Sequence, residues 1–356
     1  MNSSKNFVIV KTSSIGDIIH AFPVLEYLKA KFPDCCIDWV VERSCYDLVK
    51  SHPLIRDVIC IDTRKWKKHL FSISTWKEIK DVFSILRSSH YDVIFDLQGN
   101  IKSAFVTVLL RSSQKVGFSL SSLREKPNFL ATNIRYSVSL QKNVRSRHLD
   151  LMKKFFRDEK VFDPQDVVLS LVKEDMVRLQ QISDNFSSDS IPTILVAFGS
   201  KWENKRLSKD TLRAFLQKVY DAQNVKFLFV WASEEEKTIA EELCSVFSKS
   251  MNFGKVSLPL LQALIYQVDA VIAMDSALLH LCGTTTTPSF SIFGPSSLQV
   301  YKPEGSNHVG VQGTCPYNRV FVSHCPLLRT CPTGACIKNL SPDDLASQFL
   351  RFWHQK

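Results

Sequence analysis

The 356-residue sequence contains no apolar run long enough to cross a membrane and no glycine-rich phosphate motif. Its longest apolar runs, 194–198 and 227–232, have the length of strands, far short of the roughly 20 residues that a membrane-spanning helix needs. The N-terminus has a short apolar run followed directly by Lys11, and it shows no signal-peptide cleavage pattern. We therefore expect a soluble, cytoplasmic protein.

Several common ligand-binding motifs are also missing. No G-x-G-x-x-G follows an expected strand, which removes the best evidence for a dinucleotide-dependent oxidoreductase. No G-x-x-x-x-G-K-[ST] is present, which counts against a P-loop NTPase. Because no group of Asp, Glu and His has the spacing of a metal site, we predict no tightly bound metal. We also expect no cofactor.

The 10 cysteines are spread through the chain and do not form the dense framework of a small secreted domain. We expect them to be reduced thiols. The exception is a C-terminal group whose spacings lack the paired C-x-x-C hooks of common zinc sites, so we favour packing over metal binding for it. This group consists of Cys315, Cys325, Cys331 and Cys336.

Positive charge is concentrated in the first half of the chain. The formal net charge is +10, and residues 64–154 alone carry 18 basic and 6 acidic side chains. A polyanion is expected to approach this region, and nucleic acid, an anionic membrane surface and a phosphorylated lipid all fit, as does an ordinary solvated face. No recognisable nucleic-acid-binding motif accompanies the charge, so nucleic-acid binding is the weaker alternative.

Short apolar, β-rich runs alternate with helix-length segments, which is the pattern of parallel α/β layers. A polar stretch interrupts this alternation of expected strands and helices, which then resumes. We therefore expect two doubly wound, Rossmann-like domains, 1–182 and 191–356, joined by a linker at 183–190. Such domains bind ligands at the carboxyl ends of their strands, and we expect the active site in a cleft between them. The runs are 7–10, 37–41, 58–61, 93–97, 194–198, 227–231, 270–274 and 289–293.

The first of these strands leads into a polar turn and then a helix, from Lys11 to Asp17. Gly16 suits a tight turn, and Asp17 falls in the first helical turn, where the helix dipole stabilises a carboxylate. An acid at this position is usually only a dipole partner. A carboxylate kept ionised there can also accept a proton from a hydroxyl group, which makes Asp17 a candidate general base.

The segment VKTSSIGDIIHAFPVL at 10–25 resembles the opening of heptosyltransferase I enzymes of glycosyltransferase family 9. The tail at 324–345 is instead similar to the cysteine-rich ends of heptosyltransferase II-like members. Further segments resemble the family in order along the chain: DWVVE, RKWKKHLFS, DLQGNIKSA and LREKP in the first half, and GSKWENKRLS, VWASEEEK, MDSALLHL and IFGPSS in the second.

The resemblance implies a GT-B fold and an inverting transfer of heptose from ADP-L-glycero-D-manno-heptose to the Kdo region of a lipid A precursor, in lipopolysaccharide inner-core synthesis. It also implies peripheral contact with the anionic inner membrane on its cytoplasmic face, and no nucleic-acid partner. Two alternatives within the family stay open: a different acceptor, as in heptosyltransferases II and III, or a different nucleotide sugar.

The resemblance also implies roles for individual residues. Asp17 is the expected general base. Glu236 is the expected ribose ligand, with Glu235 as its alternative. Two positions depart from many relatives, since Ala277 replaces a glycine and Leu207 replaces a tryptophan. The expected acceptor-binding residues are Lys11, Arg64, Gln98, Lys102 and Arg124. The expected donor-binding residues are Ser14, Ser200, Lys201, Lys205, Glu236, Val256, Leu258, Asp275, Ser276 and His280.

Overall fold

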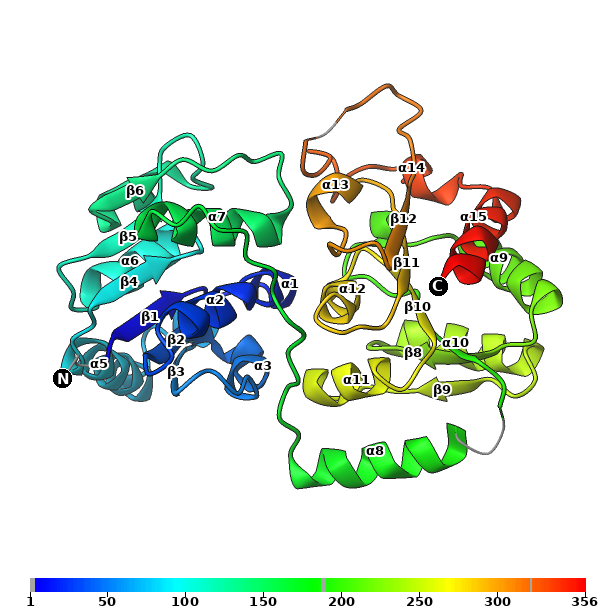
Figure 1. Ribbon diagram of the computed structural model, residues 1–356, viewed down its shortest axis with the longest axis horizontal. Helices are drawn as coiled ribbons and strands as arrows, with labels where there is room; N and C mark the ends of the chain where they lie inside the picture. The colour runs from blue at the N-terminus through cyan, green and yellow to red at the C-terminus, as the bar shows by residue number, and fades with distance from the viewer. Residues whose placement is uncertain (1–3, 187–189, 321) are drawn as a thin grey trace. The chain divides into compact units, whose positions relative to one another are not determined.

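The computed structural model describes residues 4–186, 190–320 and 322–356. The chain forms two compact units, Met1–Gln165 and Asp166–Lys356, each built around a parallel six-stranded sheet (Figure 1). All eight strands expected from the apolar runs are present, with ends within one residue of expectation. The α/β prediction is therefore confirmed, and each sheet gains two strands that the apolar runs did not reveal.

The sheet of the first unit has the strand order β3-β2-β1-β4-β5-β6. All of its pairings are parallel, and this order is the doubly wound order of the Rossmann fold. Its strands are β1 (Asn6–Val10), β2 (Cys36–Glu42), β3 (Asp57–Ile61), β4 (Val93–Asp96), β5 (Lys115–Phe118) and β6 (Ile134–Tyr136).

Helices cover both faces of this sheet. On one face, α5 and α6 pack on the sheet through a buried aliphatic cluster that includes Val82 and Val106. On the other, α2 and α7 contact each other, and Phe7 and Phe95 of the sheet meet Phe156 of α7 in a group of aromatic rings. The helices are α1 (Ile15–Ile19), α2 (Pro23–Lys31), α3 (Tyr46–Lys50), α4 (Thr63–Lys68), α5 (Ile73–Ser88), α6 (Ile101–Leu109) and α7 (Val144–Phe156), with 3-10 turns η1 (Arg43–Cys45) and η2 (Lys126–Ala131).

The second unit repeats the same winding. Its strand order is β12-β11-β10-β7-β8-β9, and all of its pairings are parallel. The apolar runs did not predict β9 and β12, which lie at the edges of the sheet. These strands are short or interrupted by polar residues and glycine, so they lack a continuous apolar run. The strands are β7 (Thr193–Ala197), β8 (Lys226–Val230), β9 (Met251–Phe253), β10 (Ala270–Met274), β11 (Ser289–Phe293) and β12 (His308–Gln312).

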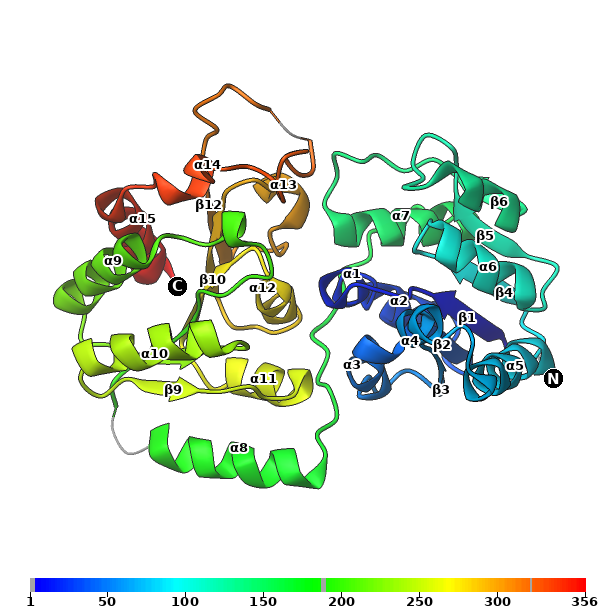
Figure 2. The same ribbon diagram turned by 180° about the vertical axis from the view of Figure 1, so that it is seen from behind.

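The core of the second unit lies between its sheet and the helices α9, α10 and α15. Helices α11 and α12 contact each other and lie on the opposite side of the sheet from α9 and α15 (Figures 1 and 2). The helices are α8 (Lys173–Phe186), α9 (Lys209–Ala222), α10 (Glu234–Val246), α11 (Leu258–Ile265), α12 (Ala277–Cys282), α13 (Leu298–Tyr301), α14 (Ala335–Lys338) and α15 (Pro342–Gln355), with the 3-10 turn η3 (Glu203–Lys205).

The structural division differs from the expected linker at 183–190. The two units divide between Gln165 and Asp166, and α8 extends through residues 183–186 at the start of that stretch. Helix α8 belongs to the second unit because Ile182 packs with Leu260 and Leu264 of α11 in a small buried cluster. The polar composition of 183–190 predicted a linker there, but it did not reveal the amphipathic helix α8 that runs into this stretch. Residues 187–189 lie outside the described part of the chain.

Candidate functional site

The carboxyl ends of the central strands carry most of the expected site residues. Lys11 follows β1 and Gln98 follows β4 in the first unit, whereas Ser200 follows β7 and Asp275 follows β10 in the second. In open α/β sheets this edge is where ligands bind. We describe the residues of each unit separately.

In the first unit, Asp17 lies in the first turn of α1 and is tied to the residue that precedes that helix. The backbone N–H and the hydroxyl of Ser14 each donate to the same carboxylate oxygen of Asp17, both at 3.0 Å. Ser14 is exposed and Asp17 is half-buried, so the carboxylate is held in place while part of it is still accessible.

Charges around Asp17 keep this carboxyl ionised. Burial acts to raise its pKa, but the Lys11 ammonium, the two bonds from Ser14 and the Arg124 guanidinium outweigh burial and lower the pKa below its usual value of 3.8. The Lys11 side chain is buried, which lowers the pKa of its amine against the opposing effects of Asp17 and Asp96. An ionised, partly exposed carboxylate beside buried positive charge can accept a hydroxyl proton.

A buried carboxylate, Asp96, fixes the loop after β4. Its Oδ1 accepts the backbone N–H groups of Gln98 and Gly99, both at 3.0 Å, and its Oδ2 accepts Asn128 Nδ2 at 2.7 Å. Gly99 has φ = +67°, in the left-handed region that favours glycine. Through this loop, Gln98 is placed to accept the backbone N–H of Thr12 at 3.0 Å, so the β4 loop supports the turn before Asp17.

Lys11 joins the same arrangement, because its Nζ donates to the backbone oxygen of Leu97 at 2.9 Å. Trp39 Nε1 also donates to the backbone oxygen of Lys11 at 2.9 Å. The structure therefore brings together Lys11, Ser14, Asp17 and Gln98 from the expected set. None of the supporting residues in this arrangement, Asp96 included, was singled out from the sequence.

The other expected acceptor residues lie in different surroundings. Lys102 of α6 forms a 2.6 Å ion pair with Glu42, a buried carboxylate that also accepts the hydroxyl of Thr63. Arg124 is exposed and acts on Asp17 and Lys11 through charge. Arg64 is exposed on α4, and no contact links it to the Asp17 arrangement among the interactions of the described residues.

His148 is a further group in this region that the sequence did not reveal. It is buried on α7, and its Nδ1 lies 3.0 Å from the backbone oxygen of Val144. Burial is the main reason why the pKa of His148 lies well below the usual histidine value of 6.5, and Lys11 adds to this effect while Asp17 opposes it. A neutral imidazole is therefore expected near Asp17 at pH 7.

In the second unit, Asp275 collects polar partners from three segments. Lys205 Nζ lies 2.5 Å from Asp275 Oδ2, and the hydroxyl of Ser296 donates to the same oxygen. His280 Nε2 lies 3.5 Å from Asp275 Oδ1. The Ser200 hydroxyl donates to the backbone oxygen of Asp275 at 3.5 Å. The structure thus brings together four expected residues and adds Ser296, which lies within the IFGPSS segment at 292–297.

The Asp275 carboxyl is fully ionised at neutral pH. Burial acts to raise its pKa, but hydrogen bonding from His280 and the charge of Lys205 lower the pKa far below 3.8. Ser276, the residue that precedes α12, is half-buried beside it. Two residues differ from those of many relatives. Ala277 is the first residue of α12, and Leu207 packs against the core of the second unit.

Glu236 is buried and fixed, whereas Glu235 is exposed. Glu236 Oε2 accepts the backbone N–H of Ala232 at 2.8 Å, at the start of α10. A Cβ at Gly199 would clash with the Glu236 carboxylate as it is placed here, so the lack of a side chain at Gly199 lets the loop after β7 approach this carboxylate. Arg206 binds Glu235 at 3.1 Å and lies 3.8 Å from Glu236, and it connects both acids to the β7 loop.

The two expected adenine contacts are less distinctive. Val256 is half-buried and packs against the cluster of α8 and α11, which fits an ordinary core residue. Leu258 is half-buried at the first position of α11.

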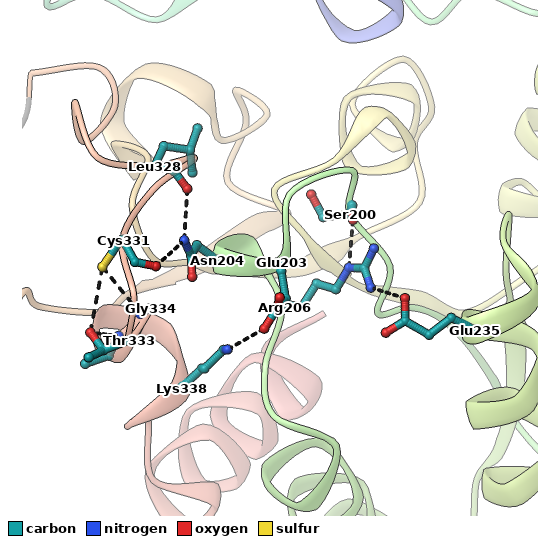
Figure 3. A network of polar contacts seen from close by, with 11 residues as sticks. Ser200, Glu203, Asn204, Arg206, Glu235, Leu328, Cys331, Thr333, Gly334 and Lys338 are labelled. Atoms are coloured by element: carbon teal, nitrogen blue, oxygen red, sulfur yellow. Dashed lines mark hydrogen bonds and ion pairs between the residues drawn. The ribbon is translucent and has the colours of Figure 1, made fainter.

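The cysteine-rich tail holds the loop that carries Lys201 and Lys205. Asn204 Nδ2 donates to the backbone oxygens of Leu328 and Cys331, both at 3.0 Å (Figure 3). Lys201 is exposed, and its ammonium lies 5.4 Å from the ring centre of Trp202. This loop is therefore fixed from one side by the tail.

A second set of contacts fixes the same loop. Arg206 Nε donates to the backbone oxygen of Ser200 at 2.7 Å, and Lys338 Nζ lies 2.7 Å from Glu203 Oε1 (Figure 3). Arg329 of the tail lies over the Trp202 ring at 4.6 Å. The tail thus supports the loop through hydrogen bonds, an ion pair and a ring contact.

The thiols of the tail lie close enough to influence one another. The charges of Cys315, Cys331 and Cys325 add to burial in raising the pKa of Cys336 to about 11. All ten cysteines are free thiols. Within residues 4–186, 190–320 and 322–356, no group of three or more His, Cys, Asp or Glu side chains is arranged to hold a metal ion. In the same ranges no helix is both long and apolar enough to cross a bilayer.

Comparison with known proteins finds relatives of this chain in one family. The family model for glycosyltransferase family 9 (heptosyltransferase) matches residues 79–329. Lipopolysaccharide heptosyltransferase 1 of Escherichia coli K12 is 25% identical over 85% of this chain and 92% of its own length. Lipopolysaccharide heptosyltransferase 1 of Campylobacter coli is 29% identical over 83% of this chain and 86% of its own length.

A solved structure has the same fold. The Escherichia coli heptosyltransferase WaaC with ADP-2-deoxy-2-fluoro heptose superposes with a TM-score of 0.77 at 22% identity, covering 97% of this chain and 99% of that chain. The two Rossmann-like sheets are therefore those of the GT-B fold, as the sequence predicted.

Proposed function

Because the chain belongs to glycosyltransferase family 9, the heptosyltransferase family, we propose that it transfers heptose from ADP-L-glycero-D-manno-heptose to the Kdo region of a lipid A precursor. The observation that carries this proposal is Asp17, a partly accessible carboxylate held ionised by Lys11 and Ser14. The names of the relatives support lipopolysaccharide as the product class, and a WaaC complex supports an ADP-sugar donor.

In the proposed reaction, Asp17 accepts the proton of an acceptor sugar hydroxyl while that oxygen attacks the anomeric carbon of the donor. The bond from this carbon to the diphosphate breaks on the opposite side, which inverts the configuration and releases ADP. Asp17 is suited to this step because its low pKa keeps it ready to accept a proton at pH 7. Lys11, Gln98 and Arg124 would orient the acceptor around it.

The second unit would bind the donor. Negative charge grows on the diphosphate as the glycosidic bond breaks, and fixed cations stabilise that charge. Lys205 and the exposed Lys201 supply such cations, and Ser200 and Ser276 supply hydroxyl donors. Asp275 would bind heptose hydroxyls and also orient Lys205 through the 2.5 Å ion pair. Glu236 would accept the ribose hydroxyls, next to the adenine contacts Val256 and Leu258.

The acceptor is expected to reach the first unit from an anionic membrane surface. The segment Arg64–Phe71, which includes all of α4 except Thr63, places Lys65, Lys67 and Lys68 beside an aromatic residue that is fully exposed, Phe71. Basic side chains near an anionic leaflet are attracted to it, and apolar side chains insert at its interface. Arg64 and Lys102 would then meet the phosphates and carboxylates of the acceptor head.

A transfer assay tests the proposal. The protein is given ADP-heptose or a GDP-sugar with a Kdo-containing lipid A acceptor, and the acceptor mass and released nucleotide are measured. We expect one heptose to be added and ADP to be released in equal amount. Transfer only from another nucleotide sugar, or only to an acceptor that already carries heptose, would replace this proposal with one of the two family alternatives.

A further inference from the structure

The first unit contains a cavity of about 550 Å³ between α4, α5 and α6. Its walls are mainly aliphatic and aromatic, and its volume lies within the roughly 300–1,000 Å³ that small-molecule sites occupy. This cavity is separate from the hydrogen-bonded turn around Asp17, because none of the residues of that turn lines it. Its apolar walls include Trp66, Val82, Phe83, Leu86, Phe105 and Leu109.

Four of the polar side chains that line the cavity are bonded within the protein. Thr63 and Lys102 both bind the Glu42 carboxylate, and Asn100 Oδ1 accepts the backbone N–H of Ser103 at 2.9 Å. Glu125 accepts the backbone N–H of Ile101 at 2.9 Å. The cavity therefore offers mainly apolar contact.

The helices that line the cavity carry exposed apolar and basic side chains. Phe105 of the cavity wall is 57% exposed, and Ile73 and Trp76 at the start of α5 are 88% and 58% exposed. Lys67 lines the cavity and is exposed, and it belongs to the basic helix α4. The ligand that fits both features is an alkyl chain attached to an anionic head.

We propose that this cavity binds one acyl chain of the anionic lipid acceptor, with the head group held at the rim by Lys67 and by the N–H groups of Lys102 that do not bind Glu42. The inference rests on the proposed function for the identity of the lipid. Lys102 connects the cavity with the proposed acceptor site, because it lines the cavity and is also an expected acceptor-binding residue. The cavity thus fixes the lipid part of the substrate while its sugar extends from the rim.

Calorimetric titration of the full chain tests binding without catalysis. Tetradecyl phosphate, octyl phosphate and inorganic phosphate are titrated below their micelle concentrations. Because affinity grows with each buried methylene group, tetradecyl phosphate should bind at least tenfold more tightly than octyl phosphate, and inorganic phosphate more weakly still. Equal binding of all three would mean that the cavity takes no alkyl chain and would overturn the proposal.

Two tryptophan variants on one helix locate the site. Leu109 lines the cavity and is half-buried, whereas its neighbour Val108 is 60% exposed and does not line it. Leu109→Trp should weaken tetradecyl phosphate binding at least tenfold, and Val108→Trp should change it less than twofold. If Leu109→Trp does not fold, Phe105→Ser replaces it, because the exposed Phe105 side chain tolerates a polar substitution. Equal affinity in the cavity and control variants would overturn the proposal.

Transfer to acylated and deacylated acceptors separates this inference from the proposed function. Leu109→Trp should raise KM at least fivefold for the acylated acceptor and leave KM for the deacylated acceptor within twofold. A parent protein that binds tetradecyl phosphate but transfers no heptose would contradict the proposed function alone. Normal transfer with the same KM change for both acceptors would contradict the cavity assignment alone.

Discussion

Lys205 and Asp275, 70 residues apart in the sequence, form a 2.5 Å ion pair at the carboxyl edge of the second sheet. The lysine follows β7 and the aspartate follows β10, and these two strands are neighbours. Ser296 and His280 also contact the aspartate, so its charge is satisfied from several sides. This arrangement orients the lysine, which the sequence analysis names as a donor-binding residue without a partner for it.

Lys205→Ala is expected to weaken ADP binding about tenfold or more. A hydrogen bond to a charged group contributes roughly 1.5 to 3 kcal/mol, and about 1.4 kcal/mol is a tenfold change in affinity. Calorimetric titration with ADP measures the effect. Lys218→Ala is the matched control, because Lys218 pairs with Asp343 on the surface. Equal ADP affinity in the parent and Lys205→Ala would place the diphosphate away from the Asp275 cluster.

Asp275→Asn is expected to destabilise the protein in a pH-dependent way. The folded-state pKa of Asp275 lies below its ordinary value of 3.8, so its ionisation stabilises the fold above pH 3.8. That stability is lost as pH falls below 3.8, because the unfolded chain takes up the proton first. The melting-temperature gap between parent and variant should be constant from pH 7 to 5 and should shrink toward pH 3.

The control for this experiment is Asp221→Asn, which changes an exposed carboxylate on α9. Its melting-temperature gap should be small throughout, since surface changes usually alter stability by less than about 0.5 kcal/mol. A gap for Asp275→Asn that widened on acidification would contradict the assignment of a depressed pKa.

Asn204→Ala is expected to raise the donor KM about three- to tenfold with little change in kcat. The substitution removes two bonds to backbone oxygens of the cysteine-rich tail, and each such bond contributes about 0.5–1.5 kcal/mol. Steady-state kinetics with varied donor gives the two constants. Asn307→Ala removes a similar bond, to the backbone oxygen of Thr286, and serves as the control. Equal KM changes in both variants would indicate general destabilisation.

The central strands could be predicted because each is a continuous apolar run buried on both faces of its sheet. β1 and β10 are examples, with nearly every residue buried. The edge strand β6, by contrast, contains only three half-buried residues, and β12 contains a glycine and a glutamine, so neither has such a run. The unit boundary was also missed, because α8 has a polar outer face that hides its packing on α11.

The candidate site was predictable where residues follow strands in recognisable segments, as Asp17 and Lys205 do. It was not predictable where a contact joins distant parts of the chain. Ser296 meets Asp275 through the fold, and Asp96 supports the β4 loop from a buried position that looks like any strand end. No local pattern marked His148, because its surroundings come from packing of α7 against the sheet.

Charge reversal in the basic helix α4 is expected to raise the acceptor KM. Arg64→Glu together with Lys67→Glu would repel an anionic acceptor and an anionic membrane, and we expect at least a tenfold rise in acceptor KM on vesicles with an anionic lipid. The donor KM should change less than twofold. Lys77→Glu with Lys80→Glu on α5 is the control for net charge. A change in donor KM alone would assign α4 to a different role.

Asp17→Asn is expected to lower kcat about 10²- to 10⁴-fold while leaving ADP affinity within twofold, because positioned proton transfer contributes about that much to rate. Asparagine is close in size and can still accept the bonds from Ser14, so the variant removes charge and basicity without emptying the turn. Initial rates at saturating donor and acceptor, melting temperature and ADP titration are measured together.

Asp47→Asn is the matched control, because Asp47 is also an acid in the first turn of a five-residue helix in the same unit. If an acid only interacts with the helix dipole, neutralising it lowers the stability of the protein by about 0.3–1 kcal/mol and leaves turnover unchanged. Since the pKa of Asp17 lies below 3.8, the parent should also lose no activity through Asp17 protonation between pH 8 and 5. Near-parental kcat in Asp17→Asn, with a melting-temperature change like that of Asp47→Asn, would show that Asp17 only stabilises α1.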